Sequence, residues 1–127
     1  MTAIVAHRGA SADHPENTER AFEHALCEPP SADGFECDVR LSADGLPYVF
    51  HDDDTRRLTG QPGTIEGRTA AEIEALRVSG EAIPTLSTLL RLVTAHASAP
   101  LVLNVELKPT GDPAPLIAAC RPLLEAI

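Results

Sequence analysis

The sequence is poor in aromatic side chains and in positive charge. Of its 127 residues only 3% are aromatic and none is Trp, so its core has to come mainly from Leu, Val, Ile and Ala. Lys and Arg number 10 against 19 Asp and Glu, which gives a net charge of −9. Because this charge repels a phosphate backbone, we expect no nucleic-acid partner. Acidic residues that converge on one spot can instead bind a cation.

The sequence also lacks long apolar runs and paired cysteines. No run approaches the length that spans a bilayer, so we expect no transmembrane segment. The N-terminus MTAIVAHRG has neither the charged region nor the apolar stretch of a signal peptide. The three cysteines, Cys27, Cys37 and Cys120, do not have the spacing of a zinc site or a redox motif. An odd cysteine count without a signal peptide indicates a reducing, cytoplasmic location.

Apolar runs that alternate with helical patterns predict one α/β domain. Short strands separated by helices are typical of right-handed βαβ units and a parallel sheet. The hydrophobic fraction of 43% is enough for one modest core. The predicted strands are residues 3–7, 34–42 and 101–108, and the predicted helices are residues 16–26, 69–76, 85–97 and 115–127.

The run LPYVFH, residues 46–51, follows the second strand after only a tight turn. A parallel partner would need a crossover of about a dozen residues, so we expect this run to fold back antiparallel through Asp44-Gly45. A two-residue turn there places His51 directly opposite Asp38, with Cβ atoms roughly 4.5–5.5 Å apart. A β-bulge would shift this register.

Polar side chains recur where the predicted strands end. His7, Asp38 and Glu106 lie at or near the carboxyl ends of parallel strands, so they gather at one edge of the sheet, and the hairpin returns His51 to it. Each one alone has an ordinary interpretation, such as a structural histidine or the wet face of an edge strand. We interpret residues 52–54, three aspartates, as solvated loop acids, and Asn17 or Thr18 as a helix cap.

Taken together, these side chains are of the types that cleavage of a phosphodiester requires: metal ligands, an acid, a base and positive charge. Glu36, Asp38 and Glu106 are carboxylates without nearby thiolates, which suits Mg²⁺ or Ca²⁺. His7 and His51 can exchange protons near neutral pH. Positive side chains suited to phosphate oxygens follow two of the strands, at Arg8 and Lys108.

The sequence resembles the glycerophosphodiester phosphodiesterase family over nearly its whole length. HRG followed by PENT, then E-x-D, DG, HD and E-x-K in order is a specific combination, whereas any one of these motifs is weak. The resemblance implies the N-terminal portion of a (β/α)8 TIM barrel with a β-hairpin insertion after the second barrel strand, with residues 1–127 as the N-terminal half of the domain. It runs through HRGASADHPENTERAF (7–22), GFECDVRLSADGLPYVFHD (34–52), RLTGQPGTI (57–65), IPTLSTLL (83–90) and LVLNVELK (101–108).

The resemblance also implies an activity and residue roles. The family hydrolyses glycerophosphodiesters, such as glycerophosphocholine, to glycerol 3-phosphate and an alcohol. We favour His51 as the acid that protonates the leaving oxygen and His7 as the base, although the reverse assignment stays open, as does attack by water or by a neighbouring substrate hydroxyl. The implied roles are acid–base catalysis by His7 and His51, metal binding by Glu36, Asp38 and Glu106, and phosphate binding by Arg8 and Lys108.

The length of the sequence leaves other hypotheses open. A TIM barrel has eight strands and typically about 250 residues, whereas this sequence supplies three barrel strands and the hairpin. We therefore expect a truncated chain, and its open sheet edge can drive self-association. One alternative is a catalytically silent half-barrel that acts as an interaction or assembly module. Another is a phospholipase D-like toxin, which the lack of a signal peptide and of a disulfide framework disfavours.

Overall fold

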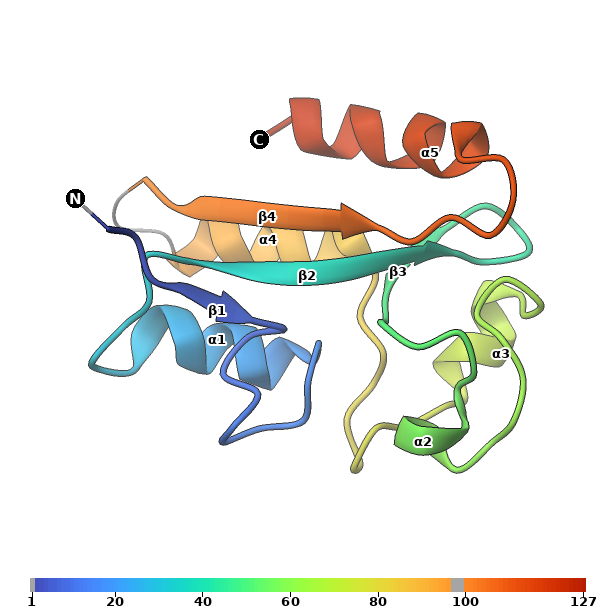
Figure 1. The fold of residues 1–127 in the computed structure, drawn as a ribbon, viewed down its shortest axis with the longest axis horizontal. Helices are drawn as coiled ribbons and strands as arrows, with labels where there is room; N and C mark the ends of the chain where they lie inside the picture. Colours follow the sequence, from blue (N-terminus) through green and yellow to red (C-terminus); the bar gives the residue numbers. More distant parts are fainter. Residues whose placement is uncertain (1, 97–99) are drawn as a thin grey trace.

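The protein is described by a computed structural model that covers residues 2–96 and 100–127 (Figure 1). One sheet carries its helices on one face and leaves the other face open. The strands are β1 (Val5–His7), β2 (Gly34–Leu41), β3 (Pro47–Val49) and β4 (Val102–Leu107). The helices are α1 (Glu19–Cys27), α2 (Arg56–Thr59), α3 (Ala70–Glu74), α4 (Leu86–His96) and α5 (Ala114–Glu125).

Strand β2 is the centre of the sheet. It pairs in parallel with β1 and β4, as predicted, and antiparallel with β3. The register places His7 beside Glu36 and Asp38 beside Glu106. Gly34 allows β4 to approach this closely, because a Cβ atom there would lie 1.8 Å from the carbonyl oxygen of Val102.

The hairpin between β2 and β3 does not have the predicted register. Arg40 pairs with Tyr48, and the backbone N–H of Phe50 donates to the carbonyl oxygen of Asp38 at 2.9 Å. The residue opposite Asp38 is therefore Phe50, and the prediction that placed His51 there is wrong by one position.

The shifted register follows from a three-residue loop, residues 43–45. The N–H of Ser42 donates to the carbonyl oxygen of Leu46, and the Ser42 hydroxyl accepts from the N–H of Leu46, both at 2.9 Å. The same hydroxyl donates to Asp44 Oδ1 at 2.6 Å. Gly45 adopts a left-handed φ of 87°, which a residue without Cβ does at little cost. These bonds close the loop around one residue more than a two-residue turn contains.

Helices α1 and α3 begin at side-chain caps. The hydroxyl of Thr18, rather than Asn17, accepts the N–H of Ala21 at the start of α1. Thr69 and Glu72 form the capping box of α3. At the other end of the chain, α5 runs through Pro122 without interruption.

The main core lies between the sheet and helices α1, α4 and α5. One face of β2 supplies Phe35, Cys37 and Val39, as expected when strand side chains alternate between the two faces. Because side chains alternate along the strand, Glu36 and Asp38 point to the other face, which carries none of the described helices (Figure 1). The helices supply Phe22, Leu86, Leu89, Leu90, Val93, Leu116 and Cys120.

A second cluster packs beside β3, beneath the segment that joins β3 to α4. The cluster consists of Tyr48, Phe50, Ile65, Ile73, Leu76, Val78 and Ile83. It holds this segment, with α2 and α3, against the hairpin.

None of the described helices is long and apolar enough to cross a membrane. Within residues 2–96 and 100–127, β4 pairs only with β2, and the self-association predicted through its edge stays a prediction.

Candidate active site

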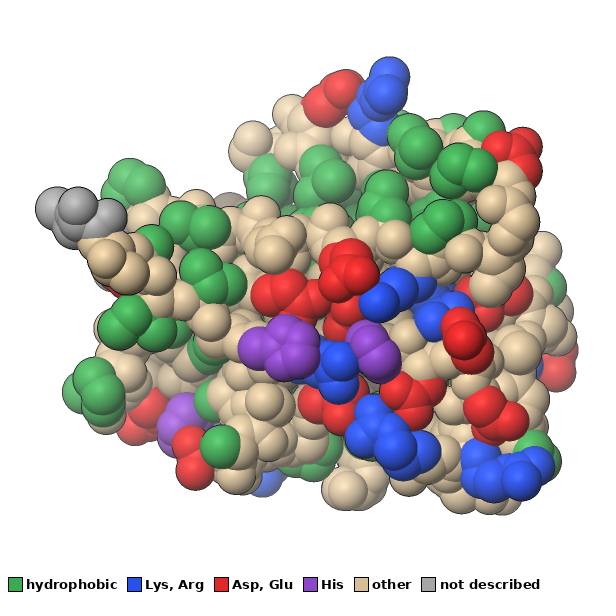
Figure 2. Space-filling model, in the orientation of Figure 1, with side chains coloured by type: hydrophobic (Ala, Val, Ile, Leu, Met, Phe, Trp, Pro, Cys, Tyr) green, Lys and Arg blue, Asp and Glu red, His purple; other side chains and the backbone are tan. Residues whose placement is uncertain are grey.

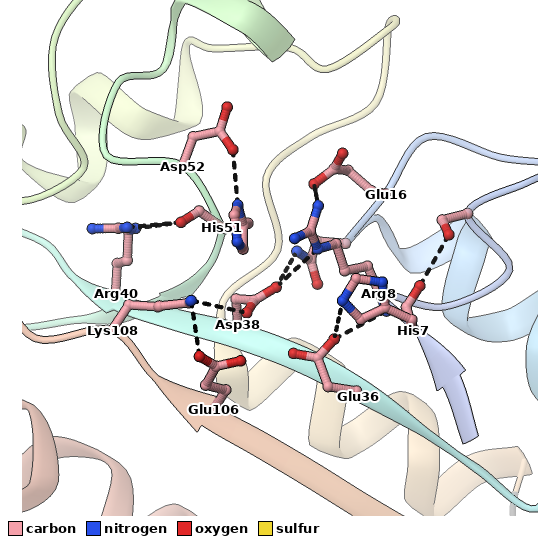
Figure 3. Close-up of polar contacts among 12 residues, drawn as sticks. His7, Arg8, Glu16, Glu36, Asp38, Arg40, His51, Asp52, Glu106 and Lys108 are labelled. Atoms are coloured by element: carbon pink, nitrogen blue, oxygen red, sulfur yellow. Dashed lines mark hydrogen bonds and ion pairs between the residues drawn. The ribbon is translucent and has the colours of Figure 1, made fainter. Parts of the chain in front are cut away.

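Charged side chains gather on the open face of the sheet, near the carboxyl ends of β1, β2 and β4. Figure 2 shows acidic, basic and histidine side chains clustered there, and Figure 3 shows how the labelled residues lie. The structure brings all seven predicted site residues to this region: His7, Arg8, Glu36, Asp38, His51, Glu106 and Lys108.

The three predicted metal ligands lie together. Glu36, Asp38 and Glu106 each offer a carboxylate oxygen within 4.8 Å of the other two. Glu36 and Asp38 are buried, and Glu36 Oε1 and Asp38 Oδ1 have no hydrogen-bond partner among the described residues. Burial, and then the neighbouring Asp38, raises the pKa of Glu36 from 4.5 to about 7. Buried carboxylate oxygens without donors are costly unless a cation neutralises them, so this trio fits a hard divalent ion.

Two positive side chains flank the carboxylates. Arg8 Nε lies 3.4 Å from Asp38 Oδ2, and the backbone N–H of Arg8 donates to Glu36 Oε2 at 3.2 Å. Lys108 Nζ lies 2.8 Å from Glu106 Oε1 and 4.0 Å from Asp38 Oδ1. Arg8 has a left-handed φ of 59°, an uncommon conformation for a residue with a side chain. The backbone therefore turns sharply at Arg8, the residue whose side chain reaches the carboxylates.

The two predicted catalytic histidines have different surroundings. His7 Nε2 lies 3.6 Å from Glu36 Oε2, and 67% of its side chain is exposed. His51 Nδ1 lies 2.9 Å from Asp52 Oδ1, and Arg40 donates to the carbonyl oxygen of His51 through Nη2 at 2.7 Å and Nε at 3.1 Å. His51 is therefore held through both its ring and its backbone, whereas His7 is freer.

The structure adds two residues to the candidate site that the sequence did not predict there, Asn17 and Asp52. Asn17 is 3% exposed, and its Nδ2 donates to Asp38 Oδ2 at 3.1 Å, which orients that carboxylate. The interpretation of Asp52 as a solvated loop acid is wrong, because only 19% of its side chain is exposed and it contacts both His51 and Arg57. An H-D pair at the end of a strand was the one signal in the sequence that pointed to Asp52.

An open cavity of about 690 Å³ adjoins these groups. Its lining includes Arg40, His51, Asp52 and Lys108, so it joins one candidate catalytic histidine to one candidate phosphate-binding side chain.

A model of the glycerophosphoryl diester phosphodiesterase family matches residues 7–113. The chain belongs to this family. A similar family member, a glycerophosphodiester phosphodiesterase of Bacillus altitudinis, is 40% identical over a region that covers 85% of this chain and 46% of that protein. The chain spans about half the length of the curated relatives it matches.

Solved structures of the family superpose on the same fold. A phosphodiesterase from Oleispira antarctica, in complex with the product sn-glycerol-3-phosphate, matches with a TM-score of 0.87 and 34% identity, covering 98% of this chain and 52% of that one. A glycerophosphodiester phosphodiesterase from Agrobacterium tumefaciens matches with a TM-score of 0.78 and 38% identity, covering 97% and 54%. The α/β fold with an open sheet therefore corresponds to part of a phosphodiesterase TIM barrel, as the sequence predicted.

Proposed function

We propose that this site takes part in metal-dependent hydrolysis of glycerophosphodiesters to glycerol 3-phosphate and an alcohol. The observation that carries the proposal is the pair of buried carboxylates, Glu36 and Asp38, which lie beside Glu106. Each keeps one oxygen without a hydrogen-bond partner among the described residues, and Arg8 and Lys108 both approach Asp38, at 3.4 and 4.0 Å. Family membership supports this reaction class, and a similar phosphodiesterase has been solved with sn-glycerol-3-phosphate bound.

Glu36, Asp38 and Glu106 would hold the divalent cation, which we propose to be Mg²⁺ or Ca²⁺ because all three ligands are carboxylate oxygens. When bound, such an ion supplies positive charge that stabilises the negative charge developing on phosphoryl oxygens. Asn17 keeps Asp38 Oδ2 engaged and leaves Oδ1 available.

The positive side chains bind and orient the phosphate. Lys108 contacts Glu106 and Asp38 and also lines the cavity, so its ammonium group reaches both the carboxylates and the space for substrate. Arg8 approaches Asp38 from another strand end. Two cations from different strands fix a tetrahedral phosphate more rigidly than one, which lowers the entropic cost of reaching the reactive geometry.

The two histidines exchange protons with the substrate. We assign His51 as the acid, since it is firmly held and lines the cavity where a leaving alcohol has room. His7, which is exposed and lies beside Glu36, is the base that takes the proton of the attacking hydroxyl.

We further propose that residues 1–127 form the N-terminal half of the barrel domain and function in the cytoplasm. The first point is supported by the share of the relatives that the chain covers, and the second by the free thiols of Cys27, Cys37 and Cys120.

The test is release of glycerol 3-phosphate from glycerophosphocholine by the purified chain, with Mg²⁺ or Ca²⁺ supplied. We expect a chelator and Glu36→Ala each to abolish release, while Glu74→Ala, at an exposed position on α3, leaves it unchanged. Release that survives both chelator and Glu36→Ala contradicts the proposal. Calorimetric titration with the cation alone tests the ligand set separately. Cation binding without turnover would favour the silent half-barrel.

A further inference from the structure

A continuous row of side chains of alternating charge crosses the site from one candidate catalytic histidine to one candidate metal ligand. Every neighbouring pair in the row lies within 3.4 Å, and most of the contacts are hydrogen bonds. The row joins the loop after β3 to the loop after β1, which are far apart in the sequence. Its members in order are His51, Asp52, Arg57, Glu16, Arg8 and Asp38.

Arg57 is the centre of this row. Its Nε donates to Asp52 Oδ2 at 2.7 Å and its Nη2 to Asp52 Oδ1 at 3.0 Å, which is a two-point contact with one carboxylate. On its other side Nη1 and Nη2 donate to Glu16 Oε1 at 3.0 and 2.9 Å. The hydrogen bonds from Arg57 hold the pKa of Asp52 at about 2, so Asp52 is a carboxylate at neutral pH.

The carboxylate of Asp52 determines which ring nitrogen of His51 carries the proton. Ionised Asp52 only accepts hydrogen bonds, so the proton in its 2.9 Å contact with His51 belongs to Nδ1. The remaining ring nitrogen, Nε2, is then the one that exchanges a proton with a ligand. As the acid, the imidazolium gives up its Nε2 proton and is left as the neutral ring protonated at Nδ1. Arg40 fixes the backbone of the same residue through its carbonyl oxygen.

A different reading of this cluster is a second cation site. Glu16, His51 and Asp52 offer ligand atoms within 4.8 Å of one another. The guanidinium of Arg57, however, already donates to both carboxylates. The positive charge that this cluster attracts is therefore supplied by Arg57 itself.

We propose that Arg57 is a positioning residue that fixes the tautomer of His51 through Asp52, and that Glu16 extends the same support to Arg8. The part of this proposal that concerns turnover rests on the proposed function, in which His51 is the acid. The part that concerns the His51 ring stands on its own contacts.

The test compares Arg57→Gln and Arg57→Lys with Arg91→Gln, a control that removes one positive charge from an exposed position on α4. Nitrogen chemical shifts of the His51 ring report its tautomer, with His51→Gln used to assign the signals. We expect Nδ1 protonation in the wild type and in Arg91→Gln, and mixed tautomers in both Arg57 variants, because an ammonium lacks the planar two-point geometry.

Turnover is measured on the same variants. We expect kcat to fall roughly 10- to 100-fold in Arg57→Gln while KM changes little, since supporting residues of a site act in this range. In Arg57→Ala, added guanidinium should restore part of kcat, whereas ammonium at equal ionic strength should not. Circular dichroism verifies that each variant is folded.

The outcomes separate the two proposals. An unchanged His51 tautomer in both Arg57 variants overturns the positioning proposal, whatever the turnover shows. A wild-type chain that releases no glycerol 3-phosphate speaks against the proposed function alone, and the ring signals still decide the role of Arg57. An altered tautomer together with a reduced kcat supports both.

Discussion

Replacing Glu36 by Gln should stabilise the metal-free protein at alkaline pH. Glu36 is 7% exposed, and its pKa is raised from 4.5 to about 7, first by burial and then by Asp38. At about 1.4 kcal/mol per pKa unit, ionising this group in the folded protein costs roughly 3 kcal/mol more than in the unfolded chain. Gln has nearly the same shape and keeps an acceptor for the backbone N–H of Arg8, which donates to Glu36 Oε2.

The direction in which the free energy of unfolding changes with pH follows from proton binding by Glu36 in the folded and unfolded states. The folded protein holds the Glu36 proton more tightly than the unfolded chain, so this group favours folding below pH 4.5 and loses that contribution as the pH rises to about 7. Gln does not titrate. The free energy of unfolding of Glu36→Gln should therefore match that of the wild type near pH 4.5 and exceed it by up to roughly 3 kcal/mol at pH 8.

The assay is urea denaturation followed by circular dichroism, with a chelator present, between pH 4.5 and 8. Comparing variant and wild type at each pH cancels the titration of other groups, and Glu74→Gln controls for the loss of an acidic side chain. Excess Mg²⁺ or Ca²⁺ at pH 8 should stabilise the wild type more than the variant. A variant that is less stable at pH 8, or a difference that does not grow with pH, would refute this reasoning.

Three further changes test the packing and the charge network by the same denaturation assay. Phe22 is fully buried, and its ring centroid lies 4.6 Å from that of Phe35. Phe22→Ala should therefore cost about 3–5 kcal/mol, and a cost under about 1 kcal/mol would contradict this packing. Thr69→Ala should cost about 1 kcal/mol by removing the capping box of α3, whereas Thr69→Ser should cost little. Asp52→Asn should cost roughly 1 kcal/mol at pH 7, after allowing for solvent screening of the Arg57 pair. Because the pKa of Asp52 is lowered from 3.8 to about 2, its contribution is full above pH 3.8 and should vanish as the pH falls to 2; a difference that persists there would assign it to another cause.

The sequence predicted the sheet and the carboxylate cluster because both follow from period-two alternation. In β2 alternation sends Phe35 and Cys37 to the core and Glu36 and Asp38 to the open face, and parallel pairing then brings Glu106 beside Asp38. These features depend only on strand direction and on which residues are apolar.

The hairpin register and the support of His51 depend on contacts that no local pattern contains. Asp-Gly favours a two-residue turn, but the hydroxyl of Ser42 closes a longer loop and moves the register by one. Arg57 reaches Asp52 and Glu16 only because α2 and the loop after β1 meet in space. In the sequence, Glu16 and Arg57 read as ordinary exposed charges.

The central position of β2 also has a consequence for how the protein folds during synthesis. Its partners on one edge, β1 and β3, lie close to it in the sequence, whereas the partner on its other edge begins only at Val102. A growing chain must therefore carry β2 with that edge bare while the residues up to β4 are translated, and bare strand edges recruit wrong partners. During this interval Asp38 also lacks Lys108, so we expect nascent chains that stall before Val102 to be aggregation-prone and to depend on chaperones.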